Sequence, residues 1–123
     1  MPWLTFVGML VWSWHLDVHQ AAAIARYAAQ EASPVRTGPY ARRTLDPCAY
    51  ARTGEGLFGV TGVLRRELHY ETNVPLGRCV PPERQISFFL REFPRRYPEC
   101  AAAFFAGRDM GAVSRCWGKG RSR

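Results

Sequence analysis

The sequence predicts a small all-α domain, a helical bundle of about four to five short helices that disulfide bonds stabilise. The chain has 123 residues, which suffices for one hydrophobic core but not for two. One run shows apolar residues at the i, i+3, i+4 and i+7 positions of a helix face: Ile86, Phe89, Leu90 and Phe93. No stretch alternates polar and apolar residues over a strand's length, so β structure is expected to be minor.

The charge is basic but not concentrated in one place. The net charge is +7, from 17 basic and 10 acidic residues, and the arginines are scattered along the chain. Because nucleic-acid binders usually gather their basic residues on one face or in a tail, no specific nucleic acid is expected as a partner. Three segments are expected: an apolar N-terminus over residues 1–23, a single helical domain over 24–117, and a short basic tail over 118–123.

The N-terminal run Trp3–Trp14 is apolar and nearly uncharged. It is too short for a membrane span, which needs about 20 residues. It matches the apolar core of a secretory signal peptide, and Ala21–Ala23 offers small residues for cleavage, although no Lys or Arg precedes the run. The rival interpretations are a buried Trp-rich helix and an apolar anchor that keeps Trp3–Trp14 in contact with a membrane.

Two further helices are expected before the middle of the chain. Residues 20–32 are rich in alanine, and Ser33-Pro34 should end that helix before an exposed connector over 35–47. Residues 56–70 form the second candidate, with four apolar residues on one face: Leu57, Val60, Leu64 and Leu68. Gly56, Gly59 and Gly62 recur every three residues there, which favours the close approach of another helix.

The last third of the chain carries the clearest helical signals. Pro81-Pro82 precede a helix expected over 82–93, and Pro94 should stop or kink it. Residues 99–106 and a short final segment over 109–117 should also be helical.

The motifs point away from catalysis. Gly54–Gly59 spells G-x-G-x-x-G, but neither a buried strand before it nor an acid about 20 residues later completes a dinucleotide site. His69 is expected to be partly exposed on a helix surface, and no catalytic or metal-ligand spacing surrounds it. We therefore expect no cofactor, no bound metal and no enzymatic activity.

Four cysteines, Cys48, Cys79, Cys100 and Cys116, are the disulfide candidates. Their spacings fit no metal site, and four cysteines in a chain this small suggest a disulfide framework in an oxidising compartment. The sequence does not choose among the three pairings, and free thiols in a reducing compartment are the alternative. We expect at least one disulfide that includes Cys79 or Cys116.

Arg95, Arg96 and Tyr97 are the candidate partner-binding residues. Pro94 and Pro98 flank them, which predicts a rigid, exposed loop that loses little entropy on binding. Arginine and tyrosine are also the residue types that often contribute most to interface energy. Solvation of a helix hairpin is the alternative role for these side chains.

A series of short motifs in the C-terminal two thirds resembles one known family. The motifs are Cys48-Ala49-Tyr50 with Gly54, Cys79-Val80-Pro81-Pro82, Gln85, Pro98-Glu99, Ala101-Ala102 and Cys116. In this order they resemble the Rap/Tai immunity proteins of type VI secretion amidase effectors, with Cys100 as an additional cysteine. The resemblance implies an all-helical, periplasmic, often dimeric protein that is not an enzyme and that plugs its effector's active site.

The sequence thus leads to two functional hypotheses. The first is a non-enzymatic, immunity-like domain exported to the periplasm or secreted, which binds another protein and blocks or escorts it; a homodimer is one expected form. The alternative is a basic accessory subunit of a membrane-bound or organellar complex, with the Trp-rich N-terminus at the membrane.

Overall fold

A computed structural model describes residues 1–32, 44–51 and 54–118, with backbone alone at residues 32 and 51. It confirms the predicted all-α class with disulfide-linked cysteine pairs. The elements are α1 (Trp3–Ser13), α2 (Val18–Ala32), β1 (Tyr50–Ala51), β2 (Gly54–Glu55), α3 (Gly62–Thr72), α4 (Pro82–Arg96), α5 (Pro98–Phe105) and the π-helix η1 (Val113–Gly118). In the described residues the two named strands form one short antiparallel pair, β1–β2, and isolated bridges join Pro2 to Thr44 and Glu55 to Val60.

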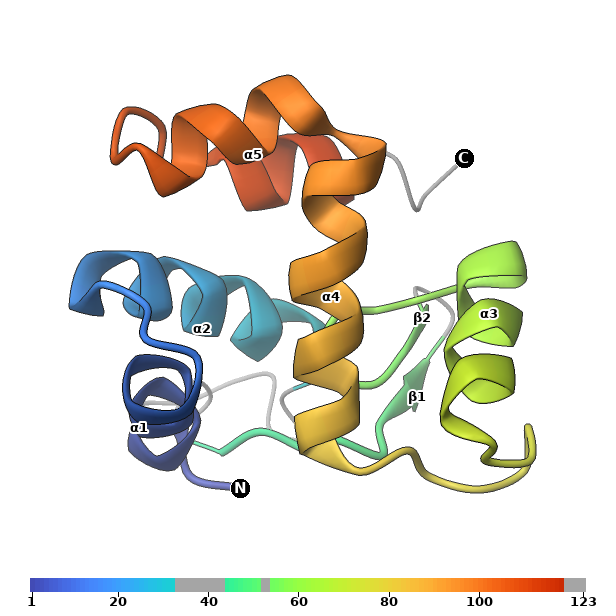
Figure 1. The fold of residues 1–123 in the computed structure, drawn as a ribbon. Helices are drawn as coiled ribbons and strands as arrows, with labels where there is room; N and C mark the ends of the chain where they lie inside the picture. The colour runs from blue at the N-terminus through green and yellow to red at the C-terminus, as the bar shows by residue number, and fades with distance from the viewer. Residues whose placement is uncertain (33–43, 52–53, 119–123) are drawn as a thin grey trace.

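Helix α4 lies at the centre of the fold (Figure 1). Helices α1 and α2 pack against each other on one side of it, and α3 with the β1–β2 pair lies on the other side. Helix α5 crosses the C-terminal end of α4 and contacts both α4 and η1. The arrangement leaves α4 as the element that every layer of the core shares.

The core is built on the aromatic side chains of α4. Ile86, Phe89 and Phe93 are fully buried, as predicted, whereas Leu90 is only half-buried. The ring of Phe89 stacks on Phe58 at a centroid distance of 4.3 Å. The same ring stacks on Phe93 at 5.3 Å and meets the edge of Trp117 at 5.0 Å. Residues far apart in the chain thus close the core around one phenylalanine.

The apolar N-terminal run forms helix α1, which packs into this core. Phe6 and Leu10 are fully buried. The amino group of Met1 donates a hydrogen bond to the carbonyl of Leu45 over 2.7 Å. In the described part of the chain, no helix is both long enough and apolar enough to cross a membrane.

The predicted start of the middle helix at residue 56 is wrong. Helix α3 begins at Gly62, and the preceding glycines belong to β2 and the turn after it. Gly54, Gly56, Gly59 and Gly62 have φ angles of 141°, 76°, 59° and 53°. These values lie in the region that glycine adopts without a steric penalty, so the glycines build a tight turn and not a helix contact.

The other predicted boundaries are closer, with one exception at Pro94. Helix α4 passes through Pro94 and ends at Arg96, and the helical hydrogen bond from the N–H of Tyr97 to the Phe93 carbonyl, at 2.9 Å, spans the proline. The expected helix over 99–106 is α5, and the expected final helix corresponds in part to η1. Most of the expected connector 35–47 and nearly all of the tail 118–123 lie outside the described residues.

Two disulfide pairs link separate segments of the fold. Cys48 pairs with Cys79 at a Cα–Cα distance of 5.2 Å, and Cys100 pairs with Cys116 at 6.6 Å. The first pair joins the segment before β1 to the segment before α4, and the second joins α5 to η1. The prediction that a disulfide includes Cys79 or Cys116 is confirmed by both pairs.

Candidate functional site

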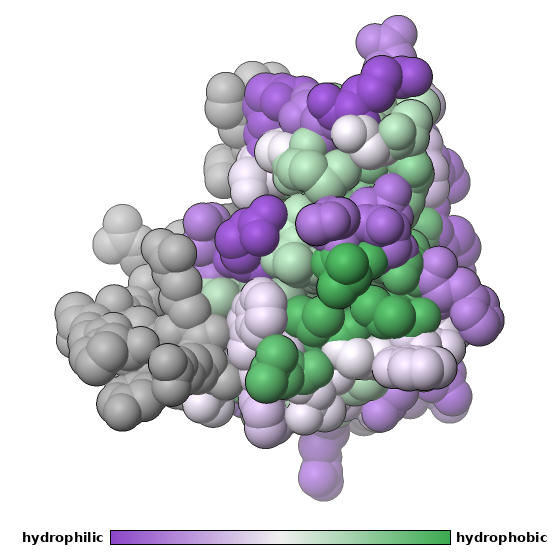
Figure 2. Space-filling view, turned by 90° about the vertical axis from the view of Figure 1, so that its left-hand side faces the viewer, coloured by the Kyte–Doolittle hydropathy of each residue, from purple (hydrophilic) through white to green (hydrophobic). Residues whose placement is uncertain are grey.

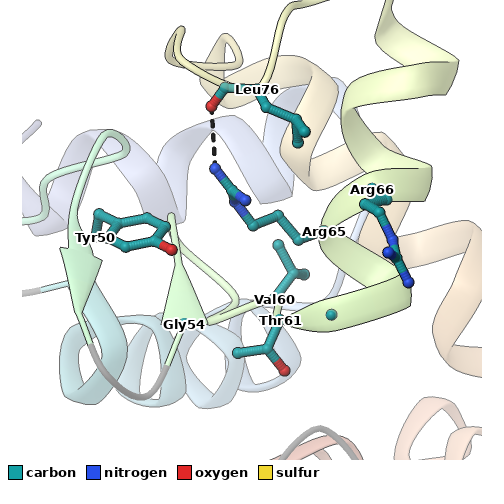
Figure 3. A pocket seen from close by; sticks show the side chains of 8 residues that line it. Tyr50, Gly54, Val60, Thr61, Arg65, Arg66 and Leu76 are labelled. Atoms are coloured by element: carbon teal, nitrogen blue, oxygen red, sulfur yellow. Dashed lines mark hydrogen bonds between the residues drawn. The ribbon is translucent and has the colours of Figure 1, made fainter.

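A surface depression lies between the β1–β2 pair, the start of α3 and the segment before Cys79. It consists of two open hollows, of about 620 and 410 Å³, which share Tyr50, Arg65 and Leu76 in their walls. Figure 3 shows the larger hollow, with Arg65 reaching from α3 toward Tyr50 and Arg66 at the opposite edge. We call these two hollows together the hairpin depression.

Arg65 separates the two hollows and is held in place by three groups. Its Nη2 donates a hydrogen bond to the Leu76 carbonyl over 3.0 Å (Figure 3). Its Nε lies 3.4 Å from the Glu55 carboxylate, and its guanidinium carbon lies 5.1 Å from the centre of the Tyr50 ring. Because these contacts come from different segments, the guanidinium is oriented before any ligand arrives.

The remaining cations of the depression are more exposed. Arg66 lines the larger hollow and Arg78 the smaller one. Both are exposed, and neither forms an ion pair within the described part of the chain. Tyr50 is 69% exposed although it lies against Arg65. The depression therefore presents arginine and tyrosine side chains to the solvent.

The turn beside the depression is fixed by the buried side chain of Gln85. Its Oε1 accepts a hydrogen bond from the Leu57 N–H over 2.9 Å. Its Nε2 donates to the carbonyls of Pro47 and Val80, each over 2.8 Å. One amide on α4 thus satisfies backbone groups next to both cysteines of the Cys48–Cys79 pair, which explains why a polar residue is buried here.

The prediction of a partly exposed His69 is wrong, because its side chain is a structural support below the depression. Only 3% of His69 is exposed. Its Nε2 lies 2.6 Å from Oε2 of Glu55, and its Nδ1 lies 3.0 Å from the carbonyl of Val74. Since Glu55 also contacts Arg65, the histidine positions the carboxylate that helps to hold the arginine. The burial leaves His69 no access to a substrate.

The candidate partner-binding residues Arg95, Arg96 and Tyr97 do not form the expected loop. Arg95 and Arg96 are the last residues of α4, and Tyr97 caps that helix. The half-buried Tyr97 ring lies 6.4 Å from the ring centres of Phe93 and Trp117. The two prolines therefore flank a helix end that is packed on the core.

Both arginines also have internal ionic partners. Arg95 donates to Glu92 over 2.8 Å, and Arg96 donates to Glu67 over 2.6 Å. Arg91 of the same helix pairs with Glu71 of α3. The Arg96–Glu67 and Arg91–Glu71 pairs join α3 to α4, whereas the Arg95–Glu92 pair lies within α4 and leaves the Arg95 side chain exposed.

The buried carboxylate of Glu92 is the centre of this network. Only 2% of Glu92 is exposed. Burial raises its pKa, but the hydrogen bond from Arg95 and the charges of Arg95, Arg96 and Arg91 outweigh burial, and the pKa lies below its ordinary value. Three cations around one carboxylate explain why a charge is tolerated there.

A second exposed feature is an apolar patch on the side of the molecule formed by α1 and the start of α2 (Figure 2). Leu4 and Trp12 of α1 and Val18 of α2 are strongly exposed. The segment 1–14 contains no charged side chain, and Figure 2 shows hydrophilic side chains that border the patch.

Sequence reasoning missed the hairpin depression. Tyr50 belongs to a short sequence motif, but its contact with Arg65 is a tertiary contact between β1 and α3. Among residues 1–32, 44–51 and 54–118, no group of three or more His, Cys, Asp or Glu residues is arranged to hold a metal ion.

Comparisons with known proteins add no assignment. No family model matches the chain, and neither a curated protein nor a solved structure does so. The resemblance to the Rap/Tai immunity proteins stays a prediction.

Proposed function

We propose that this protein is a non-enzymatic, immunity-like domain that is exported from the cytoplasm and binds another protein, which it blocks or escorts. The observation that supports this proposal is the hairpin depression, where an exposed Tyr50 and Arg66 lie beside an already oriented Arg65. Tyrosine and arginine on a rigid frame are typical of the residues that dominate protein–protein binding.

The disulfide pairs support the exported location. Disulfides persist in oxidising compartments and are rare in reducing ones. Both pairs join elements on which the depression or the aromatic core depends. The proposed locations are the periplasm or the extracellular medium.

The N-terminus needs a direct measurement. Cleavage after Ala23 would remove α1, whose Phe6 and Leu10 are fully buried, and would open the core at that side. Intact mass of the protein from its native source decides whether residues 1–23 are retained, and the mass after thiol alkylation counts the oxidised cysteines. Four alkylated thiols in the native protein would contradict the proposed export.

Site-specific photocrosslinking tests the protein-binding function. Benzoylphenylalanine is placed at Tyr50 in one variant and at Tyr70 in the control, because Tyr70 is 87% exposed on α3 but does not line the depression. In extracts of the native source, we expect one protein to crosslink in stoichiometric yield at position 50 and not at position 70. The same weak ladder at both positions would contradict the proposal.

The originally expected contact at Arg95, Arg96 and Tyr97 is tested in the same extracts. Because internal ion pairs neutralise both arginines, we propose that the triple alanine variant retains the crosslink at position 50. A second copy of this chain is one of the partners that mass spectrometry of the crosslink would identify.

The apolar patch on α1 favours a second candidate function. A basic accessory subunit of a membrane-bound or organellar complex would use Leu4 and Trp12 at a lipid or subunit interface. Flotation with vesicles of anionic lipid distinguishes the candidates. Binding that Trp12→Ser abolishes would favour the subunit, and its absence together with a crosslink at position 50 would favour the exported binder.

A further inference from the structure

We infer that the hairpin depression recognises an acidic segment of the partner protein, in which carboxylate side chains contact Arg66 and Arg78. This inference rests on the proposed protein-binding function and specifies the chemistry of the partner.

Most of the charged side chains that line the depression are positive. The larger hollow is lined by Arg65 and Arg66, and none of its described lining residues is a carboxylate. The smaller hollow is lined by Arg65 and Arg78, with Glu55 as its acid. Glu55 already faces Arg65 and His69, so it does not neutralise the other two arginines. The depression therefore retains an excess of positive charge for an anionic ligand.

The depression also has apolar surface beside its arginines. The Tyr50 ring and the exposed Leu76 side chain line both hollows, the larger of which also contains Arg66 and the smaller Arg78. A glutamate or aspartate side chain has an apolar stem that packs on such a surface and a carboxylate that accepts charge-assisted hydrogen bonds from a guanidinium. An extended acidic segment places several such side chains along the depression.

The distribution of the other arginines favours a protein segment over a nucleic acid. Nucleic acids require a track of basic residues that follows many phosphates. Arg91, Arg95, Arg96 and Arg115 are paired with carboxylates, whereas Arg26, Arg84 and Arg108 are exposed but line neither hollow. The described arginines that line the two hollows are Arg65, Arg66 and Arg78, a small set that suits a short acidic segment.

The test is a titration of the ¹⁵N-labelled protein with tetraglutamate, followed by NMR. The matched controls are tetraglutamine, which lacks the charge, and inorganic phosphate, which lacks the apolar stem. We expect tetraglutamate to shift the backbone signals of Tyr50, Gly54 and Leu76 saturably, and the control ligands to leave them unchanged. Phosphate binding as tightly as tetraglutamate at the same signals would show a simple anion site and overturn the inference.

Two pairs of variants separate the depression from the overall charge. R66Q/R78Q removes the two exposed cations of the depression, and R84Q/R108Q removes two exposed arginines outside it. The first pair should weaken tetraglutamate binding about tenfold or more, because charge-assisted hydrogen bonds are lost, and the second pair should change it less than about twofold. Equal weakening by both pairs would overturn the inference.

A failure of the acidic-segment inference is distinguishable from a failure of the proposed protein-binding function. A partner that crosslinks at position 50 and binds R66Q/R78Q as tightly as wild type would overturn the acidic segment but keep the protein-binding function. Saturable tetraglutamate binding without any crosslinked protein would support the recognition chemistry and contradict the proposed function.

Discussion

Replacement of Phe89 by alanine tests the aromatic core most directly. Phe89 is fully buried, and its ring contacts Phe58, Phe93 and Trp117, which come from three other positions of the chain. Loss of a buried phenylalanine side chain costs about 3–5 kcal/mol through lost transfer free energy and the cavity that remains. The upper half of this range is expected, because the ring contributes to three aromatic pairs that each add about 0.5–1.5 kcal/mol.

Urea unfolding followed by tryptophan fluorescence measures this change, with the disulfides kept intact. Trp117 lies 5.0 Å from the Phe89 ring, so its emission reports the packing of the same core. The control is Tyr70→Ala, which removes an aromatic ring that is 87% exposed and should change the free energy of unfolding by less than about 0.5 kcal/mol. A loss below about 1 kcal/mol for Phe89→Ala would refute the assignment of this face of α4 to the core.

Three further predictions concern charge, backbone and covalent links. The folded-state pKa of Glu92 lies below its unfolded value, so its contribution to stability is fully present above the unfolded pKa of about 4.3 and is lost as the pH falls through the folded pKa. The difference in unfolding free energy between wild type and Glu92→Gln should therefore be largest near neutral pH and shrink toward pH 3, and a pH-independent difference would contradict this. Gly54→Ala should destabilise by more than about 1 kcal/mol, because φ is 141° and the added Cβ would collide with the Gly59 carbonyl, whereas Gly77→Ala meets no atom within 4 Å and should be nearly neutral in the same urea assay. Replacement of both Cys48 and Cys79 by serine should lower the free energy of unfolding by about 2–4 kcal/mol, because the disulfide closes a sequence separation of 31 residues. It should also weaken tetraglutamate binding, because both cysteines line the smaller hollow. Unchanged stability by calorimetry would contradict the role of this pair.

The sequence by itself determined the helical class and the central helix. The spacing of Ile86, Phe89 and Phe93 identifies the buried face of α4, because a period of 3.6 residues is a local property of the chain. The cysteine count predicted a disulfide framework for a similar reason, since this expectation depends on composition and chain length. Neither the helical spacing nor the cysteine count depends on which segments of the chain meet.

The tertiary structure decided the cysteine pairing, the glycine-rich turn and the depression. The apolar residues Leu57 and Val60 fit a helix face, but positive φ angles at Gly56 and Gly59 favour a turn. Tertiary contacts stabilise this turn, among them the hydrogen bond from Leu57 to the buried Gln85 and that from Trp117 to Phe58. Glu92 shows the same limit, because its burial depends on arginines that helix geometry brings around it and on the approach of α3.

The candidate site also depended partly on local sequence patterns and partly on tertiary contacts. Pro94 and Pro98 predicted an exposed loop at Arg95 and Arg96, whereas both arginines end helix α4 and pair with Glu92 and Glu67, with Arg95 still exposed. Arg66 and Arg78 are 12 positions apart in sequence, and they line two hollows that share Tyr50, Arg65 and Leu76, residues from β1, α3 and the segment after α3. A local pattern predicts the conformation of a segment, but the balance of charges at its surface depends on which distant side chains the fold brings into contact.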